Sequence, residues 1–292
     1  MADTKPKPEL LVIVGPTASG KSELALKIAK HYRGEIIQAD SWTVYKHFDI
    51  GTGKPTITQQ KAVKHHLLDV RQATDGFNAP MFKQMAQQAI KDIQKQDKLP
   101  ILVGGTGLYI DSLLYDFGFL PSTSGDDREV LNQKTITELL ELASSRKIDL
   151  ADIDIRNKRR IIRAIEAGGQ KPTKKPLRSN SLIVGINPKP EELDMRIEQR
   201  VDRMLAAGLE KEVEQLAKKY GWEAEPMKGI GYREWQTYFA GGQTLEQTRA
   251  RIISSTKNLA KRQRTWFKRS PDIQWFSSAD EAYGFISSTL SN

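Results

Sequence analysis

Cysteine is absent from the 292 residues of this sequence. Disulfide bonds, catalysis by a thiolate and zinc sites with cysteine ligands are therefore excluded. The sequence also lacks a run of 18 apolar residues, so no segment is expected to span a membrane. Residues 1–8 are polar and contain neither an apolar signal core nor an arginine-rich amphipathic helix. We therefore expect a cytoplasmic protein.

Acidic residues are almost missing from two segments. Residues 156–178 hold nine basic side chains and one acidic side chain, and residues 249–269 hold eight basic side chains and no acidic one. The whole chain carries a formal net charge of +9, so the rest of the chain is net acidic. Local basic surfaces favour a polyanion as partner. A solvated helix face is the alternative for either segment by itself.

Short apolar runs alternate with helical patterns in the first part of the chain. The runs at residues 10–14, 35–39 and 99–103 are too short for helices, whereas residues 23–31 and 81–96 have apolar positions at helical spacing. Strands that alternate with helices predict an α/β fold, in which a parallel sheet is covered by helices on both faces.

The pattern changes after about residue 116. Residues 129–146 and 157–167 predict two helices with no strand between them, and another apolar strand is expected at 182–186. Further helices begin near residues 191 and 245.

The simplest domain organisation is one core with one insertion. We expect residues 1–115 and 181–292 to form the α/β core with its C-terminal helices, and residues 116–180 to form a helical insertion domain. Because this insertion carries the first basic segment, it is a candidate for binding a polyanion.

Residues 15–22 match the phosphate-binding pattern G-x-x-x-x-G-K-[ST] in full, between a predicted strand and a predicted helix. The backbone amides of such a loop point at an anion, and the lysine adds a positive charge. The serine hydroxyl of Ser22 would bind a magnesium ion, so we expect Mg²⁺ as a cofactor. The residues expected to bind the phosphates are Gly15, Pro16, Thr17, Ala18, Ser19, Gly20, Lys21 and Ser22.

This loop by itself leaves two kinds of reaction open. Typical P-loop ATPases have a strand that ends in an acid, but the strand at 99–103 is followed by Gly104 and Gly105. The strand at 35–39 does end in an acid, Asp40. An acid there suits a small-molecule or nucleotide kinase, and it equally suits a carboxylate that acts on an acceptor during transfer of a group attached to a diphosphate.

Several segments, in order from about residue 10 to residue 276, resemble the tRNA dimethylallyltransferases of bacterial type, also called tRNA isopentenyltransferases. The segments are residues 15–22, 39–41, 44–45, 49–52, 54–55, 65–67, 102–109, 160–163, 230–232, 260–263 and 265–266. The resemblance implies a P-loop NTPase-like core with a helical insertion. It also implies transfer of a dimethylallyl group from dimethylallyl diphosphate to the exocyclic N6 amine of the adenine 3′ to the anticodon in tRNA, with release of diphosphate.

The resemblance assigns roles to a few residues. Asp40 would accept the proton of the amine, while Lys21 and Thr106 would stabilise the departing diphosphate. Arg200 would add positive charge from a following helix, with Arg196 as the weaker candidate. Capping a turn or holding magnesium is the alternative for Asp40, and Thr106 could belong to a plain strand-to-helix turn.

The resemblance also implies contacts with the anticodon stem-loop of tRNA. The implied residues are Asp40, Ser41, Trp42, Thr43, Thr106, Arg128, Arg159, Arg160, Arg163, Lys228, Arg233, Lys257, Lys261, Arg262 and Gln263. In the last of these segments Lys257, Lys261, Arg264 and Lys268 recur at helical spacing, which predicts a basic face opposite an apolar one. Nothing in the sequence demands more than a monomer.

Two positions leave alternatives open. Trp42 and Thr43 stand where the family commonly has Met-Gln, and Trp42 suits stacking on a base as well as packing. His65 and His66 could suggest a metal site, but adjacent side chains on a strand point apart and no third ligand is evident. Structural roles are therefore the favoured interpretation of both histidines.

Overall fold

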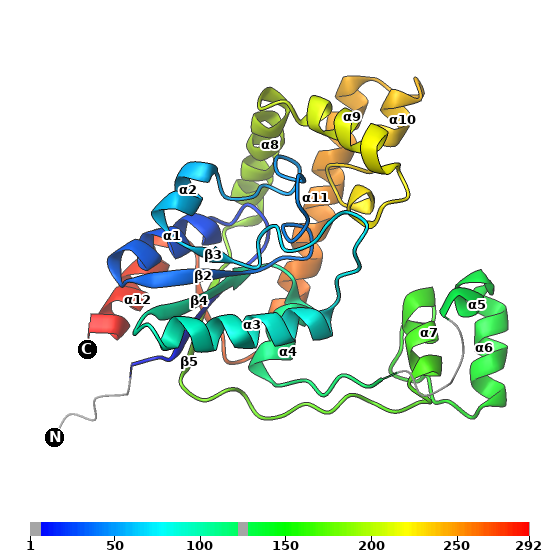
Figure 1. Cartoon of the computed structure of the whole chain (residues 1–292), viewed down its shortest axis with the longest axis horizontal. Coiled ribbons are helices and arrows are strands. Elements are labelled where there is room, and N and C mark those ends of the chain that lie inside the picture. Colours follow the sequence, from blue (N-terminus) through cyan, green and yellow to red (C-terminus); the bar gives the residue numbers. More distant parts are fainter. Residues whose placement is uncertain (1–6, 122–127, 292) are drawn as a thin grey trace. The chain divides into compact units, whose positions relative to one another are not determined.

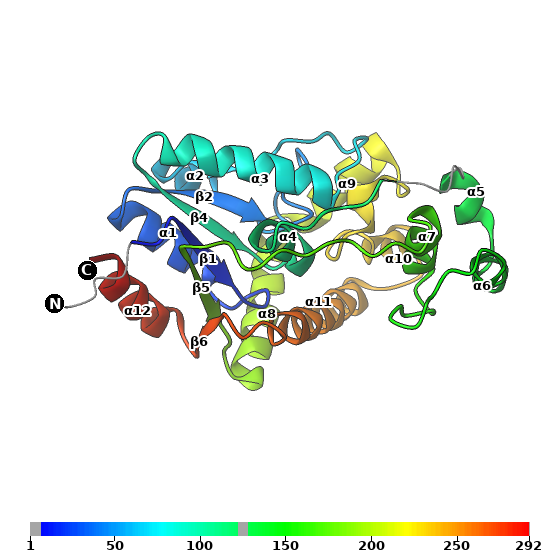
Figure 2. The same cartoon turned by 90° about the horizontal axis from the view of Figure 1, so that it is seen from below.

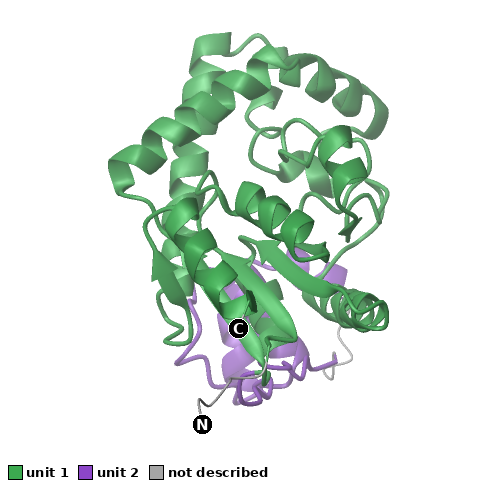
Figure 3. Cartoon of the chain, turned by 90° about the vertical axis from the view of Figure 1, so that its left-hand side faces the viewer, with its two compact units in different colours: residues 1–114, 178–292 green, residues 115–177 purple. Residues whose placement is uncertain are grey.

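A computed structural model describes residues 7–121 and 128–291 (Figure 1). The chain divides into two compact units, which are residues 1–114 with 178–292 and residues 115–177 (Figure 3). The first unit contains the sheet, and the described part of the second unit is helical. Across the described residues, no helix is both long and apolar enough to cross a lipid bilayer.

Six parallel strands form the sheet, in the order β3-β2-β4-β1-β5-β6. Their bounds are β1 Leu10–Val14, β2 Gly34–Ala39, β3 His65–His66, β4 Leu99–Gly104, β5 Ser181–Ile186 and β6 Gln274–Phe276. Every residue of β1 is buried, as expected for a parallel strand whose two faces are both covered. The predicted α/β fold with a parallel sheet is confirmed. The short edge strands β3 and β6 were not predicted, because two or three residues carry too little pattern.

Helices cover both faces of this sheet. Their bounds are α1 Lys21–His31, α2 Ile57–Ala62, α3 Ala79–Gln94, α4 Gly107–Leu114, α8 Pro190–Ala206, α9 Leu209–Tyr220, α10 Trp235–Phe239, α11 Leu245–Phe267 and α12 Ala279–Ser291, with a 3₁₀ helix η1 at Glu225–Lys228. On one face, α1 and α12 pack side by side, where Leu24 and Ile286 join Ile36 and Ile101 of the strands. On the other face, α3 packs against β2, β4 and α4 (Figure 2).

A second apolar cluster holds the C-terminal helices of the first unit together. It joins the segment after β2, represented by Tyr45 and Phe48, to Val201 of α8, Val213 of α9 and Ile252 of α11. Because the segment after β2 leaves the sheet at its carboxyl edge, this cluster fixes α8 and α11 near that edge. It thereby encloses the space in which open α/β sheets bind ligands.

The second unit differs from expectation in one respect. Residues 129–146 were predicted as one helix, but the structure has α5 Arg128–Gln133 and α6 Ile136–Ser145. Thr135 adopts an extended conformation, its hydroxyl accepts from the backbone N–H of Glu138, and the Glu138 carboxylate accepts from the backbone N–H of Thr135. This capping box starts a new helix and breaks the old one. The third helix, α7 Lys158–Glu166, packs its isoleucines against both.

Candidate active site

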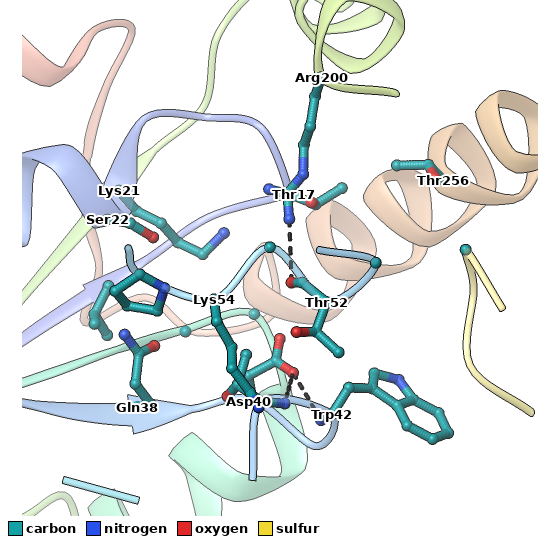
Figure 4. Close-up of a pocket in the computed structure, with 18 of the residues that line it drawn as sticks. Thr17, Lys21, Ser22, Gln38, Asp40, Trp42, Thr52, Lys54, Arg200 and Thr256 are labelled. Carbon is teal, nitrogen blue, oxygen red and sulfur yellow. Dashed lines mark hydrogen bonds between the residues drawn. The ribbon is translucent and has the colours of Figure 1, made fainter. Parts of the chain in front are cut away.

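A cavity of about 280 Å³ lies at the carboxyl ends of β2 and β4 (Figure 4). Its walls come from the phosphate-binding loop, the loop at residues 49–55, α8 and α11. Of the predicted site residues, the structure places Thr17, Lys21, Ser22, Asp40, Trp42, Thr43, Arg200 and Gln263 around this single cavity. Thr17 and Gln263, which are 246 positions apart in the chain, meet here. They meet because the strand ends, α8 and α11 lie at the same edge of the sheet.

The phosphate-binding loop has the backbone conformation of an anion cradle. Ala18 and Gly20 have positive φ angles of 62° and 93°, and no side chain of the described residues caps the N-terminus of α1. A Cβ atom at Gly15 would lie 2.5 Å from the carbonyl oxygen of Ile186, so only glycine fits this close approach to β5. The first amides of α1 are therefore available to an anion, as the loop pattern predicts.

Two half-buried cations face one carboxylate in this cavity. Burial and the nearby Arg200 lower the pKa of Lys21 to about 8, while Asp40 acts in the opposite direction. Burial also lowers the pKa of Arg200, again against the effect of Asp40. Because one carboxylate cannot compensate both cations, the cavity favours a ligand that carries negative charge.

Among the residues that the structure describes, Asp40 is hydrogen-bonded through only one of its carboxylate oxygens. Its Oδ1 accepts hydrogen bonds from the backbone N–H groups of Trp42 at 2.8 Å and Thr43 at 3.3 Å (Figure 4). This local turn fixes the side chain at the end of β2, on the wall of the cavity. The turn-capping alternative from the sequence is therefore present, and it leaves the second oxygen of the same carboxylate for chemistry.

Gln263 of α11 joins the phosphate-binding loop to the loop after β4. Its Oε1 accepts from the backbone N–H of Thr17 at 2.8 Å, and its Nε2 donates to the carbonyl oxygen of Gly105 at 3.0 Å. A Cβ atom at Gly105 would lie 2.2 Å from Nε2, so this glycine makes room for the amide. Gln263 was predicted to contact tRNA, but both ends of its amide are used inside the chain.

Thr106 lies beside the cavity rather than on its wall. Its backbone N–H donates to the carbonyl oxygen of Ala39 at 3.2 Å, and its own carbonyl oxygen accepts from Tyr109 and Ile110. The cavity wall at this point is formed by Gly104 and Gly105. These contacts fit the strand-to-helix turn that the sequence left open, and a catalytic role for Thr106 stays a prediction.

Glu212 of α9 holds the loop at residues 49–55 in place, and sequence reasoning missed it. Its carboxylate accepts from the backbone N–H groups of Asp49, Ile50 and Gly51 at 2.8–3.2 Å. It also accepts from the hydroxyl of Tyr232 at 2.7 Å. A glutamate inside an amphipathic helix gives no signal of such a role, because the three amides are far away in the chain.

The same loop positions Arg200. The guanidinium of Arg200 donates to the carbonyl oxygen of Thr52 at 3.3 Å (Figure 4). A Cβ atom at Gly53 would lie 2.1 Å from the guanidinium, so the glycine lets the arginine pass closely over the loop. The positive φ of 65° at Gly53 also favours glycine.

Residues 43–270 match the family model described as IPP transferase. This chain belongs to the IPP transferase family. It is 43% identical to a tRNA dimethylallyltransferase of Pediococcus pentosaceus, over 92% of this chain and 90% of that one. It is also 38% identical to a tRNA dimethylallyltransferase of Anoxybacillus flavithermus, over 94% of this chain and 91% of that one.

Solved structures of similar proteins agree with this family. A tRNA isopentenylpyrophosphate transferase from Staphylococcus epidermidis matches with a TM-score of 0.74 and 34% identity, over 98% of this chain and 99% of that one. A eukaryotic dimethylallyltransferase described as acting on tRNA matches with a TM-score of 0.77 and 25% identity, over 97% of this chain and 77% of that one. As a member of the IPP transferase family, the protein is a transferase, and its fold is the one that the sequence resemblance implied.

The α11 helix of this IPP transferase does not present one uniform basic face. Lys261 and Arg262 are exposed. Lys257 instead contacts Glu198 at 2.8 Å and Asp194 at 3.3 Å on α8. Arg264 donates to the carbonyl oxygen of Pro188. The predicted continuous basic face is therefore wrong in part, because helical spacing shows which side chains share a face but not what packs against it.

Trp42 is half-buried, and its neighbours Ser41 and Thr43 belong to the turn that Asp40 caps. Its indole packs over Gly229, where a Cβ atom would lie 3.3 Å from the ring, and it is tilted by 38° against Tyr45. These contacts favour the packing alternative, although Trp42 also lines the cavity.

Lys228 and Arg233 are exposed near η1. Lys228 lies 3.8 Å from the carboxylate of Glu225, and Arg233 contacts Glu234 at 3.1 Å. The Lys228 pair is exposed and therefore weak, so it leaves Lys228 open to another partner, whereas Arg233 contacts a buried carboxylate.

Two of the predicted tRNA-binding arginines in the second unit share one internal partner. Arg128 contacts the carboxylate of Glu166 at 2.6 Å, and Arg163 contacts the same carboxylate at 3.4 Å. Arg159 and Arg160, in contrast, are exposed on the first turn of α7. The exposed pair is the stronger candidate for contact with an external anion.

A magnesium ion would find one protein ligand that the sequence predicted. The Ser22 side chain lines the cavity next to Lys21. Within residues 7–121 and 128–291, no group of three or more His, Cys, Asp or Glu residues is placed to hold a metal. His66 Nε2 lies 2.7 Å from Glu35, and His65 Nδ1 lies 2.8 Å from the carbonyl oxygen of Val63, so the structural roles expected for both histidines agree with their contacts.

Proposed function

We propose that this chain transfers a dimethylallyl group from dimethylallyl diphosphate to the N6 amine of the adenine 3′ to the anticodon in tRNA. One observation carries the proposal: a half-used carboxylate, Asp40, shares a single cavity with the lysine of a phosphate-binding loop. The kinase alternative would use the same loop. The relatives that match over nine-tenths of the chain are named tRNA dimethylallyltransferases, which favours the prenyl donor.

The donor's diphosphate binds where the cavity has an excess of positive charge. The uncapped amides at the N-terminus of α1 and the ammonium of Lys21 point at its oxygens. The guanidinium of Arg200, fixed by Thr52, approaches from α8. Binding of the diphosphate compensates both half-buried cations, which is why their lowered pKa values support this assignment.

Asp40 accepts the proton that the amine must lose. The lone pair of an adenine amine is delocalised into the ring, so the amine is a poor nucleophile unless its proton is removed as the new bond forms. The bond between N6 and the first carbon of the prenyl chain forms while that carbon's bond to the diphosphate oxygen breaks. Diphosphate leaves with the electron pair, and Lys21 and Arg200 stabilise its growing charge.

Magnesium fits this arrangement as a partner of the diphosphate. The Ser22 hydroxyl would hold the ion together with phosphate oxygens and water, as is usual for Mg²⁺ beside phosphates, and the ion would supply positive charge to the leaving diphosphate. No acidic cluster is required for this role, which agrees with the residues on the cavity wall.

The tRNA contributes the acceptor base and many phosphates. A base must leave its stack to reach a cavity enclosed by α8 and α11. Lys261 and Arg262 of α11 and Arg159 and Arg160 of α7 are the exposed cations that we assign to its backbone. The proposal has the protein act as a monomer, in the cytoplasm.

A transfer assay tests the proposal. The protein is mixed with Mg²⁺, radiolabelled dimethylallyl diphosphate and unmodified tRNA whose anticodon is followed by adenine, and label on the RNA is counted. We expect label that disappears when this adenine is replaced by guanine. A protein that binds this tRNA without labelling it, and that instead transfers phosphate from ATP to a small acceptor, would establish the kinase alternative.

A further inference from the structure

The cavity contains an amide that the proposed transfer does not use. Gln38 is only 7% exposed, and its side chain lines the cavity. In the described part of the chain, no hydrogen-bond partner accompanies this amide. Figure 4 shows it on the same side of the cavity as Lys21 and Ser22, away from Trp42. The amide lines the cavity and can both donate and accept, so it is available to a polar group on a ligand.

A second polar group faces the same space. His65 lines the cavity, and its Nδ1 lies 2.8 Å from the carbonyl oxygen of Val63. A carbonyl oxygen only accepts, so Nδ1 carries the hydrogen, and in a neutral ring Nε2 is then an acceptor. Burial lowers the pKa of His65 and keeps the ring neutral at neutral pH. The cavity therefore combines an amide that can donate and accept with an imidazole nitrogen that accepts.

The strands fix where these groups lie relative to the reaction. Ile36 and Gln38 lie on the same face of β2, Asp40 follows directly after the end of this strand, and His65 pairs with Ile36 on the neighbouring strand. Gln38 and Asp40 are therefore about 7 Å apart along the strand. One isoprene unit bridges this distance when its reacting carbon lies beside Asp40. The far end of the donor's chain then meets Gln38 and His65.

We propose that this site takes a prenyl diphosphate with a hydroxyl group on the end of its five-carbon chain, and uses it at least as well as the plain dimethylallyl donor. This inference rests on the proposed transfer reaction. The hydroxyl donates to Nε2 of His65 and accepts from the amide of Gln38, and the hydroxyl itself is unchanged by the reaction. The plain donor leaves both groups to water or without a partner.

A competition experiment tests the inference. The full chain, Mg²⁺ and unmodified tRNA are incubated with equal concentrations of dimethylallyl diphosphate and 4-hydroxy-3-methylbut-2-enyl diphosphate. The ratio of the two modified adenosines is then measured by mass spectrometry of the digested tRNA. We expect at least as much of the hydroxylated product. In Gln38→Leu, the ratio should fall about tenfold, the effect of one hydrogen bond, while transfer of the plain group is kept.

Two further variants keep the test sharp. His65→Asn retains a group that can donate to the carbonyl oxygen of Val63 but removes the acceptor at Nε2, so it should lower the same ratio. Gln88→Leu makes the identical chemical change at an exposed amide of α3 and should leave the ratio unchanged.

The outcomes separate the inference from the transfer reaction on which it rests. If neither donor is transferred, the proposed function fails. Transfer of the plain group alone, or a ratio that Gln38→Leu and His65→Asn do not change, overturns the inference and leaves the function intact. Equal loss of both products in Gln38→Leu would also overturn it, because Gln38 would then serve the diphosphate that the two donors share.

Discussion

The charges inside the cavity and the charges on the surface of α7 and α11 are organised in opposite ways. In the cavity, Arg200 helps to lower the pKa of Lys21, and Asp40 acts against the lowering of the pKa at both cations. On the helices, Arg159, Lys261 and their neighbours are exposed and act independently. A small number of charges in a cavity can determine a reaction. The many exposed charges on the helices instead add up to a general attraction for a polyanion, which salt screens.

Even within one helix, the number of basic residues overstates the charge available to a partner. Four basic residues lie close together on α11, namely Lys257, Lys261, Arg262 and Arg264. Of these, Lys257 forms an ion pair with Glu198 of α8, and Arg264 donates to the carbonyl oxygen of Pro188 just before α8. Lys261 and Arg262 are the exposed pair. A basic segment therefore predicts a polyanion partner only when enough of its basic side chains have no partner within the protein.

The largest expected effect comes from the carboxylate in the cavity. Asp40→Asn keeps an oxygen that can accept from the amides of Trp42 and Thr43, so the turn is preserved while the base is removed. Turnover should fall by about 100-fold or more, with donor and tRNA affinity retained. Single-turnover kinetics and separate binding measurements check this. Near-normal turnover would show that Asp40 is not the base. It would also contradict the view that a small number of charges in the cavity determine the reaction.

Glu212 tests whether the cavity depends on a group outside it. In Glu212→Gln, an amide NH₂ replaces one oxygen that faces the backbone amides of the loop at residues 49–55. We expect a loss of about 2 kcal/mol in the free energy of unfolding. Because the loop also positions Arg200 through Thr52, the KM for the donor should rise. Denaturant unfolding and steady-state kinetics measure both effects, and Glu214→Gln on the exposed side of the same helix is the matched control.

The lowered pKa of Lys21 predicts a dependence on pH. Diphosphate binds the protonated form of Lys21, whose pKa in the free protein is about 8. Donor affinity should therefore be constant at pH values just below 8 and fall at higher pH. The fall should approach about tenfold per pH unit. The folded chain binds the proton of Lys21 less tightly than the unfolded chain. Without donor, the free energy of unfolding should therefore rise between pH 8 and the ordinary lysine pKa of 10.5.

Calorimetry of donor binding in buffers of different ionisation enthalpy measures the proton taken up above pH 8. The variant Lys21→Met should bind more weakly and show no such uptake. Uptake that persists in this variant would assign the titration to another group, and the contrast between coupled cavity charges and independent surface charges would lose its main support.

The smallest effects are expected on the surface. Changing Lys261 and Arg262 together to alanine should weaken tRNA binding severalfold. It should also reduce the slope of log affinity against log salt by about one for each phosphate that is no longer neutralised. Lys257→Ala is the matched control, because its ammonium is held by Glu198 and Asp194. Filter binding at several salt concentrations checks both variants. Equal salt slopes for the double variant and Lys257→Ala would mean that the exposure of a cation does not decide whether it contacts RNA.

Much of the core could be predicted from the sequence because its signals are local. The apolar runs that became β1, β2, β4 and β5, and the loop between β1 and α1, all depend on neighbouring residues. The break between α5 and α6 also has a local signal, Thr135 and Glu138 at capping-box spacing, but the apolar pattern of residues 129–146 continues across it. Edge strand β3 has only two residues and forms because β2 offers it a partner.

The sequence by itself determined the kind of chemistry, because a phosphate-binding loop and an acid at the end of the next strand need only short stretches of chain. Only the tertiary structure decided which charges remain free and what fills the cavity. Gln263 reaches Thr17 across 246 positions, and Gln38 comes to lie beside the phosphate-binding loop, only because the sheet brings its strand ends together. Such contacts depend on distances in space, which no local pattern of residues encodes.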